Sequence, residues 1–352
     1  MTCKPFVLFA LALSVAATVH AQASAHQARI DALMSRYAGD VPGASLLVVK
    51  DGKPLVERGY GYANLEKHIK AGPETNYRLA SVTKQFTAAS ILVLKQDGKL
   101  ELDDPIRKYL PELPTSDDGI TIENLLAHSS GLVDYEDLIP SSRTTQIDDN
   151  DVLRMIASQD RLYFQPGSAH RYSNGGYVLL GLIVERLSGM DLADFMRRRI
   201  FEPLGMDHTL LYEHRRGPKP ANRAYGYSLI ADKWTRTDQS VTSATRGDGG
   251  VYSNVSDMAK WDAALYTDKL LDAESRKLAF TPKDPVDDPD VLYGFGWRLS
   301  GGTTWHSGET MGFRNVIIRW PEQHLSVVIL SNRNQFQPYP LALAIGELFL
   351  AR

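Results

Sequence analysis

Strand-type segments lie at both ends of this chain and a helical stretch separates them, an arrangement that restricts the fold more than any other feature. Residues 44–49 and 55–62 are rich in β-branched and aromatic residues and flank Asp51-Gly52, a strong hairpin turn. Two further hairpins are predicted near the C-terminus. One has strands at 293–299 and 303–307 around Gly301-Gly302, and the other has strands at 315–320 and 325–330 around Pro321-Glu322. We therefore predict an α+β fold in which both ends of the chain build one antiparallel sheet of five or more strands.

The middle of the chain has the pattern of a helical lobe inserted after the second strand. Apolar residues recur at helical spacing beyond residue 84, in a long buried helix that ends at Gly98. The same spacing predicts shorter helices at 122–128, 151–158, 176–188, 192–200 and 257–266, and helices that cover the sheet at 26–38 and 341–350. We expect one domain over 22–352, with an α/β lobe at about 26–80 plus 290–352 and a helical lobe at about 81–289.

The first 21 residues have the features of a secretory signal peptide. Lys4 supplies the positive start, residues 6–19 are mostly apolar, and Val19-His20-Ala21 offers small residues at the cleavage positions. The apolar run is short for a membrane span. We expect cleavage and export to the periplasm or beyond, with no stable membrane span afterwards.

Composition excludes several classes of function. The only cysteine is Cys3, inside the predicted signal, so disulfides and Cys-ligated metals are excluded for the mature chain. The net charge of −3 gives no basic surface for nucleic acid. No Gly-x-Ser-x-Gly elbow, His-Glu-x-x-His zinc motif or dinucleotide-binding fingerprint is present.

Ser81-Val82-Thr83-Lys84 places a serine at the start of the long buried helix and a lysine three residues later. Because positions i and i+3 share one helical face, the amine can reach the hydroxyl. Nucleophilic acyl transfer needs a hydroxyl, a group that assists its deprotonation, and N–H donors for the developing oxyanion. Ser81 and Lys84 are therefore candidate catalytic residues, and a capped helix with an exposed lysine is the alternative.

A proton relay for the serine is offered by the pattern Tyr-x-Asn, in which the phenol moves a proton and the amide holds a carbonyl. The pattern occurs three times, as Tyr62-Ala63-Asn64, Tyr172-Ser173-Asn174 and Tyr252-Ser253-Asn254. Chemistry alone does not choose among the three. The loop context of Tyr172, between a Pro-Gly turn and a Gly-Gly pair, favours it.

A second candidate is Trp305-His306-Ser307-Gly308-Glu309, at the end of a predicted strand. A histidine followed by a glycine that allows close backbone approach can line one wall of a cleft. The backbone N–H that follows the glycine can serve as an oxyanion donor. The alternative is a half-exposed strand histidine.

These segments, Ser81–Lys84, Tyr172–Asn174 and His306–Gly308, resemble the three active-site motifs of the serine β-lactamase and penicillin-binding-protein superfamily in order and approximate spacing. Within it, the chain looks like the class C β-lactamase-related serine hydrolases, which include DD-peptidases, D-aminopeptidases and esterases. The resemblance runs from about residue 26 to about residue 335 and includes the stretches 42–44, 125–132, 203–206 and 249–253. It implies the two-lobed serine β-lactamase-like fold.

The resemblance also implies a role for each matching residue. Ser81 would be the acyl-accepting nucleophile, Lys84 would hold the proton balance, and Tyr172 would act as general base and then acid. Asn174 would contact the substrate carbonyl or the lysine. The wall of the site would be formed by His306, Ser307, Gly308 and Glu309, and the N–H groups of Ser81 and Glu309 would form the oxyanion hole. The stretches 125–132 and 249–251 would be structural supports.

One position departs from the pattern of β-lactamases, which usually carry Lys-Thr-Gly where this chain has His306-Ser307-Gly308. A histidine is mostly neutral at pH 7, so capture of a substrate carboxylate is weakened and efficient β-lactam hydrolysis is disfavoured. Arg314 is a nearby residue that would compensate.

The first hypothesis is an exported serine hydrolase that acts through an acyl-enzyme on a small amide or ester, without cofactor or metal. Its substrate would be a D-alanyl peptide, a β-lactam or a carboxylic ester. The second hypothesis keeps the fold without catalysis, as a domain that recognises peptidoglycan peptides.

Overall fold

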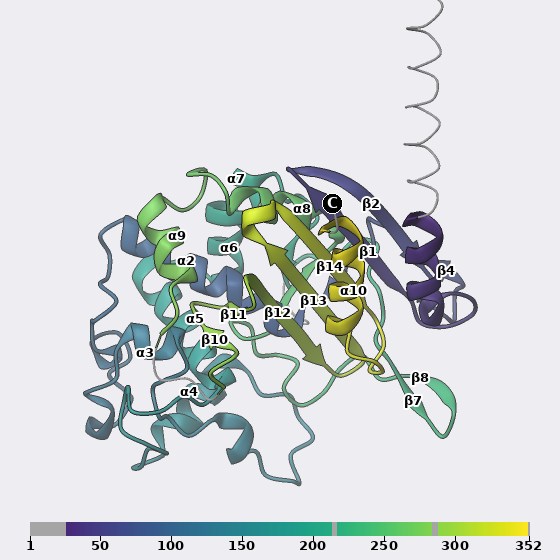
Figure 1. Ribbon diagram of the computed structural model, residues 1–352. Coiled ribbons are helices and arrows are strands. Elements are labelled where there is room, and N and C mark those ends of the chain that lie inside the picture. The colour runs from purple at the N-terminus through teal and green to yellow at the C-terminus, as the bar shows by residue number, and fades with distance from the viewer. Residues whose placement is uncertain (1–25, 213–216, 284–287, 351–352) are drawn as a thin grey trace, which may run out of the picture.

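The sheet predicted from both ends of the chain is present, with seven antiparallel strands in the order β10-β11-β12-β13-β14-β1-β2 (Figure 1). A computed structural model describes residues 26–212, 217–283 and 288–350, so the predicted signal peptide lies outside the described residues. The strands are β1 (Ala44–Lys50), β2 (Lys53–Tyr60), β10 (Leu292–Tyr293), β11 (Arg298–Ser300), β12 (Thr303–Thr310), β13 (Phe313–Trp320) and β14 (Leu325–Ser331). Because β1 pairs with β14, the N-terminal hairpin extends the C-terminal meander.

Alternating side chains divide the core between the two faces of the sheet. Leu46 and its partner Ile329 pack with the terminal helices, whereas Leu47 and its partner Val328 pack with the helical lobe. The terminal elements are a helix at 26–33 that continues as the 3-10 helix η1 (Met34–Tyr37), and α10 (Tyr339–Leu350), which lies over β13 and β14 in Figure 1. Both helices predicted to cover the sheet are therefore present.

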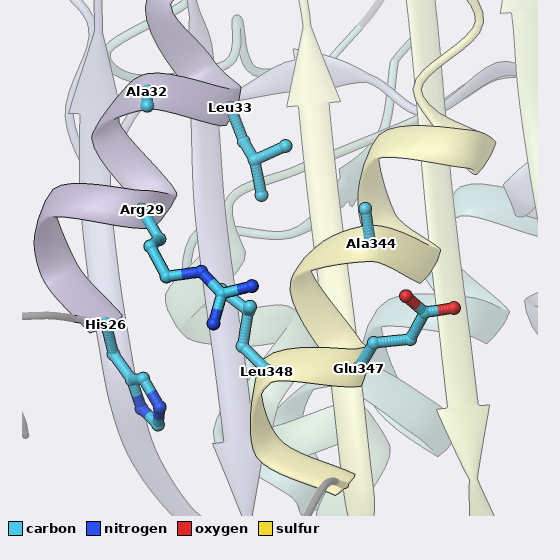
Figure 2. A pocket seen from close by; sticks show the side chains of 7 residues that line it. All are labelled: His26, Arg29, Ala32, Leu33, Ala344, Glu347 and Leu348. Carbon is cyan, nitrogen blue, oxygen red and sulfur yellow. The ribbon is translucent and has the colours of Figure 1, made fainter.

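A hollow opens between these two terminal helices. Figure 2 shows Arg29 and Leu33 on the first helix facing Ala344 and Glu347 on α10. Ile30 and Leu348, on the same two helices, belong to the core of this outer face, whereas Val82, the neighbour of Ser81, belongs to the core of the other face. The hollow is thus separated from the candidate catalytic serine by the sheet.

The helical lobe is organised around one buried helix, α2 (Lys84–Gln96), whose residues are buried from Lys84 to Leu94. A helix that is buried on all sides has to be surrounded by protein, and α5 (Asn174–Ser188), α6 (Leu192–Met196) and α9 (Ala273–Phe280) pack against α2. Gly98 follows α2 with φ of 66°, as predicted for the end of this helix. The remaining helices are α3 (Ile122–Leu126), α4 (Asp149–Ala157), α7 (Glu202–Leu204) and α8 (Val255–Ala264).

Short turns of other helical types complete the lobe. The predicted helix at 192–200 ends early as α6 and continues as a π-helical turn, η6 (Arg197–Phe201). The 3-10 turns are η2 (Ala80–Thr83), η3 (Ile106–Lys108), η4 (Thr115–Asp117), η5 (Tyr135–Leu138) and η7 (Pro321–Gln323). None of the helices in the described ranges combines the length and apolar character needed to cross a membrane.

Several very short strands were not predicted from the sequence, and within the described ranges they form three small sheets outside the main one. One small sheet has the order β5-β9-β6, and its strands β5 and β9 bring Arg78 opposite Tyr252. These strands are two to four residues long, which is too short for a clear alternating pattern in the sequence. They are β3 (Tyr62–Asn64), β4 (Ile69–Lys70), β5 (Tyr77–Arg78), β6 (Leu210–Leu211), β7 (Tyr227–Ile230), β8 (Lys233–Arg236) and β9 (Val251–Ser253).

The strand predicted at 293–299 is broken into β10 and β11. Between them Gly296 has φ of 77°, a left-handed conformation that interrupts a strand. A Cβ atom on Gly296 would lie 2.9 Å from the Lys84 carbonyl oxygen. The break therefore lets the chain pass close to the first residue of α2.

Candidate active site

Ser81 lies in η2, at the junction between the small sheet and α2. Ala80 has φ of 50°, a conformation that costs free energy for a residue with a side chain. The backbone before it is held from two sides, because the Leu79 N–H donates to the Val251 carbonyl at 2.8 Å and Asn315 Nδ2 donates to the Arg78 carbonyl at 2.8 Å. These bonds fix the strained turn that presents Ser81.

Lys84 is fully buried, and its ammonium group has three acceptors around it. The Nζ atom lies 3.2 Å from Ser81 Oγ, 2.7 Å from Asn174 Oδ1 and 3.0 Å from the Asp248 carbonyl oxygen. An ammonium group has three protons to donate, so these three contacts use all of them. The Ser81–Lys84 pair predicted from helical spacing is within hydrogen-bond distance, and Asn174 contacts the lysine.

Asn174 is placed by the N-terminal cap of α5. The Ser173 hydroxyl accepts the Gly176 N–H at 3.1 Å and donates to Asp134 Oδ2 at 2.6 Å. The same carboxylate oxygen accepts the Gly175 N–H at 3.0 Å. A carboxylate at a helix N-terminus is favoured by the dipole, so Asp134 stabilises the turn that carries Asn174.

Tyr172 lies beside Lys84, whose Nζ is 4.9 Å from the centroid of the phenol ring. The ring of His128 also packs against the ring of Tyr172, with centroids 4.3 Å apart. No hydrogen bond joins the Tyr172 hydroxyl to Ser81, although both residues belong to the described part of the chain. The structure thus brings the tyrosine to the lysine, and its role as general base remains a prediction.

The other two Tyr-x-Asn tyrosines have different partners. The Tyr252 hydroxyl accepts a hydrogen bond from Arg223 Nη2 at 3.0 Å. The ring of Tyr62 carries the Lys70 ammonium 3.7 Å from its centroid. Of the three, Tyr172 is the one that contacts Lys84.

His128 belongs to a stretch that the resemblance assigned to structural support. Its Nδ1 accepts the Ser173 N–H at 3.1 Å, which leaves the proton of the neutral ring on Nε2. Burial, followed by the charge of Lys84, holds the pKa of His128 well below its ordinary value. A neutral imidazole packed on Tyr172 and bonded to the next residue positions that phenol ring.

His306 is also buried, and its contacts define its tautomer. Its Nδ1 lies 2.6 Å from the Ser307 carbonyl oxygen, which only accepts, so Nδ1 carries the proton. Its Nε2 lies 3.1 Å from the Tyr293 hydroxyl and accepts from it. Burial, together with the charges of Arg298 and Lys84, lowers the pKa of His306 to about 3. His306 is therefore neutral at pH 7 and supplies no positive charge to a substrate carboxylate.

This shift predicts a pH dependence of stability. Unfolded His306 binds a proton below its ordinary pKa of 6.5, whereas folded His306 does so only near 3. The contribution of His306 to the free energy of unfolding is therefore complete above pH 6.5. It is lost as the pH falls, by about 1.4 kcal/mol per pH unit. In urea unfolding between pH 5 and 6.5, we expect His306→Gln to reduce the slope of the unfolding free energy by this amount.

A matched control is His208→Gln, because the His208 side chain is 47% exposed. It should leave that slope unchanged. Equal slopes for wild type and His306→Gln would show that folded His306 takes up a proton as readily as the unfolded residue does.

The wall formed by β12 packs directly against η2, the turn that contains Ser81. Beyond Trp305 this strand has no pairing to β11, and η2 packs there instead. A Cβ atom on Gly308 would lie 2.0 Å from the Leu79 carbonyl oxygen. Glu309 and Ser81 line one pocket, and their predicted role as a pair of oxyanion donors stays a prediction.

Arg314, the residue expected to compensate for the missing lysine, is held by its own hairpin. Its guanidinium donates to the carbonyls of Thr310 and Phe313 at 2.9 and 2.8 Å and lies 3.4 Å from the Glu309 carboxylate. The predicted wall residue Glu309 also accepts from Gln337 at 2.9 Å. The charge of Arg314 is thus already paired.

Two carboxyl groups near Lys84 were not identified from the sequence. Glu136, in η5, and Asp248 line the same pocket as Ser81. Burial raises the pKa of each, and Asp134 and Asp248 raise the pKa of Glu136 further, whereas the charge of Lys84 lowers the pKa of both carboxyls. Both lie in irregular segments, where no periodic pattern marks them. Among the described residues, no three His, Cys, Asp or Glu side chains converge in a way that would hold a metal ion.

Comparisons with known proteins place this geometry in a family. The β-lactamase family model matches residues 26–350. Penicillin-binding protein 4* of Bacillus subtilis (strain 168) is 32% identical over 317 residues, which are 85% of this chain and 70% of that protein. Protein flp of Staphylococcus aureus (strain MW2) is 31% identical over 324 residues, which are 88% of this chain and 63% of that protein. The chain thus spans about two thirds of the length of these relatives.

Solved structures agree with the fold. The octameric penicillin-binding protein homologue from Pyrococcus abyssi has a TM-score of 0.82 and 26% identity, covering 94% of this chain and 77% of that one. D-amino acid amidase from Ochrobactrum anthropi SV3, complexed with L-phenylalanine amide, has a TM-score of 0.79 and 26% identity, covering 94% and 98%. The chain therefore belongs to the β-lactamase family, within the serine β-lactamase and penicillin-binding-protein superfamily of hydrolases.

Proposed function

We propose that this protein is an exported serine hydrolase that cleaves a small amide or ester through an acyl-enzyme on Ser81. The observation that carries the proposal is the contact of 3.2 Å between Ser81 Oγ and the buried Lys84 Nζ, on a strained turn at the edge of a pocket. A hydroxyl is a weak nucleophile until a neighbouring group removes its proton. Lys84 contacts the Ser81 hydroxyl, and Tyr172 lies beside Lys84.

The reaction follows from these positions. The Lys84–Tyr172 pair enters the reaction lacking one proton, with either the amine neutral or the phenol ionised. Ser81 Oγ attacks the substrate carbonyl carbon as its proton passes to this pair, and the backbone N–H groups of Ser81 and Glu309 stabilise the oxyanion. The same pair returns the proton to the leaving amine or alcohol as the carbonyl re-forms. Water then attacks the ester on Ser81 and gives up a proton to the pair, which returns that proton to Ser81 Oγ as the acid leaves. The role of Asn174 is to hold the Lys84 side chain next to Ser81.

Acyl-enzyme formation is tested by labelling the wild-type chain. We expect a fluorophosphonate to add one label per molecule, and tryptic digestion to place it on the peptide 79–84, with fragment ions that assign it to Ser81 rather than Thr83. A label distributed over several surface serines, or none on a chain shown to be folded by its thermal transition, would contradict the proposal.

The substrate class is open among three candidates: D-alanyl peptides, β-lactams and carboxylic esters. The neutral state of His306 and the paired state of Arg314 argue against substrates that depend on carboxylate capture. The likeness to D-amino acid amidase adds amides of amino acids to the candidates. Comparison of kcat/KM for a D-Ala-D-Ala peptide, a chromogenic cephalosporin and a p-nitrophenyl ester separates them.

A non-catalytic domain that binds peptidoglycan peptides is the second candidate, and the likeness to penicillin-binding proteins favours it. It predicts binding of such peptides without turnover or labelling of Ser81. Export to the periplasm or beyond is supported by the signal-like segment at 1–21.

A further inference from the structure

The helix α10 is more apolar than its position in the fold requires. Its 12 residues include one charged side chain, that of Glu347. Ile345 packs into the core on the outer face of the sheet. Toward solvent, Leu343, Ala344 and Leu350 are only partly buried, and Glu347 is exposed among them. A helix that is apolar on all sides is normally covered on all sides, so this solvent side of α10 lacks a partner among the described residues.

The solvent side of α10 forms one wall of the hollow in Figure 2, and the helix at 26–33 forms the other. The hollow has a volume of about 700 Å³. Ala32 and Ala344, one on each helix, have short side chains that leave this space open. Because helices pack by placing side chains into the grooves of their neighbours, a further helix can lie between these two.

The hollow carries one charge of each sign, and the two charges are unpaired. Figure 2 shows Arg29 reaching from the first helix into the hollow, whereas Glu347 belongs to α10. Both residues are exposed, and within the described ranges neither side chain forms an ion pair or a hydrogen bond. Asp31, on the same helix as Arg29, is instead paired with Arg58 at 2.8 Å. An occupant that suits the hollow therefore brings an apolar surface with one positive and one negative charge.

A second copy of this chain has these properties. Its α10 is an apolar helix with a single acidic residue, which suits a groove beside Arg29. In a pair related by a two-fold axis every contact is reciprocal, so Arg29 of each copy meets Glu347 of the other. A membrane surface is a poorer occupant, because its anionic headgroups attract Arg29 and repel Glu347.

We propose that the hollow between the helix at 26–33 and α10 is a dimer interface, in which two copies pack these helices together around a two-fold axis. The interface covers the solvent side of α10 and pairs Arg29 with Glu347 twice. It lies on the outer face of the sheet, whereas Val82, the neighbour of Ser81, belongs to the core of the other face. Each copy keeps its own candidate active site, so the inference does not depend on the proposed hydrolase function.

The first test is the mass of the wild-type protein in solution. Sedimentation equilibrium between about 1 and about 100 μM should show a dimer with a Kd of about 1 μM or below. Arg29→Glu and Glu347→Arg each place like charges opposite one another twice, so each should raise this Kd by about 100-fold or more. The chain that carries both substitutions restores opposite charges, and its Kd should return to within about 10-fold of wild type. Arg198→Glu, at an exposed position in the helical lobe, is the control and should leave the Kd unchanged.

Each alternative occupant gives a different result. A wild-type mass of one chain over the whole range would overturn the dimer. A dimer that withstands both single charge reversals would place the contact elsewhere on the surface, and would overturn the interface. Sedimentation of single chains with vesicles of phosphatidylethanolamine and phosphatidylglycerol, lost in Leu343→Ser, would assign the solvent side of α10 to a membrane instead. Thermal transitions show that each variant is folded, and the wild-type mass decides the question without any variant.

Discussion

Ser81→Ala should lower kcat/KM for any accepted ester or amide by about 10⁴-fold or more, since removal of a nucleophile forces the reaction onto direct attack by water. The variant should also take up no fluorophosphonate label. Because only one oxygen atom is lost from a residue that is half-buried, the thermal transition should stay close to that of wild type. Steady-state kinetics and intact mass measure both effects. Turnover near the wild-type rate would place the nucleophile elsewhere.

Lys84→Met should lower activity less than Ser81→Ala does. Methionine keeps the length of the side chain and removes the amine, so acid–base assistance is lost while the nucleophile remains. We expect kcat/KM to fall by about 10²- to 10⁴-fold. The substitution leaves Asn174 Oδ1 and the Asp248 carbonyl without their donor, so the melting temperature is measured in parallel to separate lost chemistry from lost structure.

Gly308→Ala should destabilise the fold by about 3 kcal/mol and reduce acylation beyond what the unfolded fraction explains. The added methyl would lie 2.0 Å from the Leu79 carbonyl oxygen, which is backbone and cannot rotate away. β12 and η2 then have to separate, and η2 carries Ser81. Urea unfolding gives the stability, and the rate of fluorophosphonate labelling gives the acylation.

Gly72→Ala is the matched control, because a Cβ atom on Gly72 meets nothing within 4 Å and its φ is not in the left-handed region. This variant should behave like wild type in both measurements. If Gly308→Ala were as stable and as rapidly labelled as Gly72→Ala, the close approach of β12 to the serine turn would be wrong.

The parts of the fold that were predictable are those with local patterns. The turn at Asp51-Gly52, with φ of 50° and 72°, fixes the first hairpin, and short runs of aliphatic and β-branched residues mark β13 and β14. The Ser81–Lys84 pair was predictable because helical spacing alone brings the two side chains together. In each case the information lies within a few neighbouring residues.

Long-range contacts explain what was missed. The break at Gly296 depends on the approach of Lys84, which is remote in the sequence. Glu136 and Asp248 gain their importance only because η5 and the segment before β9 meet at one pocket. His306 was expected on the wall as a mostly neutral residue, but the burial that lowers its pKa to about 3 and its bond to Tyr293 are not expressed in the sequence pattern.

Because β1 pairs with β14, the complete sheet cannot form until the C-terminal strands have been synthesised. Ala44 pairs with Ser331, so β1, the first strand to be synthesised, lacks this partner until β14 has been made near the end of synthesis. Until then the apolar residues of β1 have only β2 beside them, and contacts between segments so distant in the chain form slowly. Until nearly all of the chain has emerged, the apolar residues of β1 lack their main partner strand, and exposed strands of this kind are prone to aggregate.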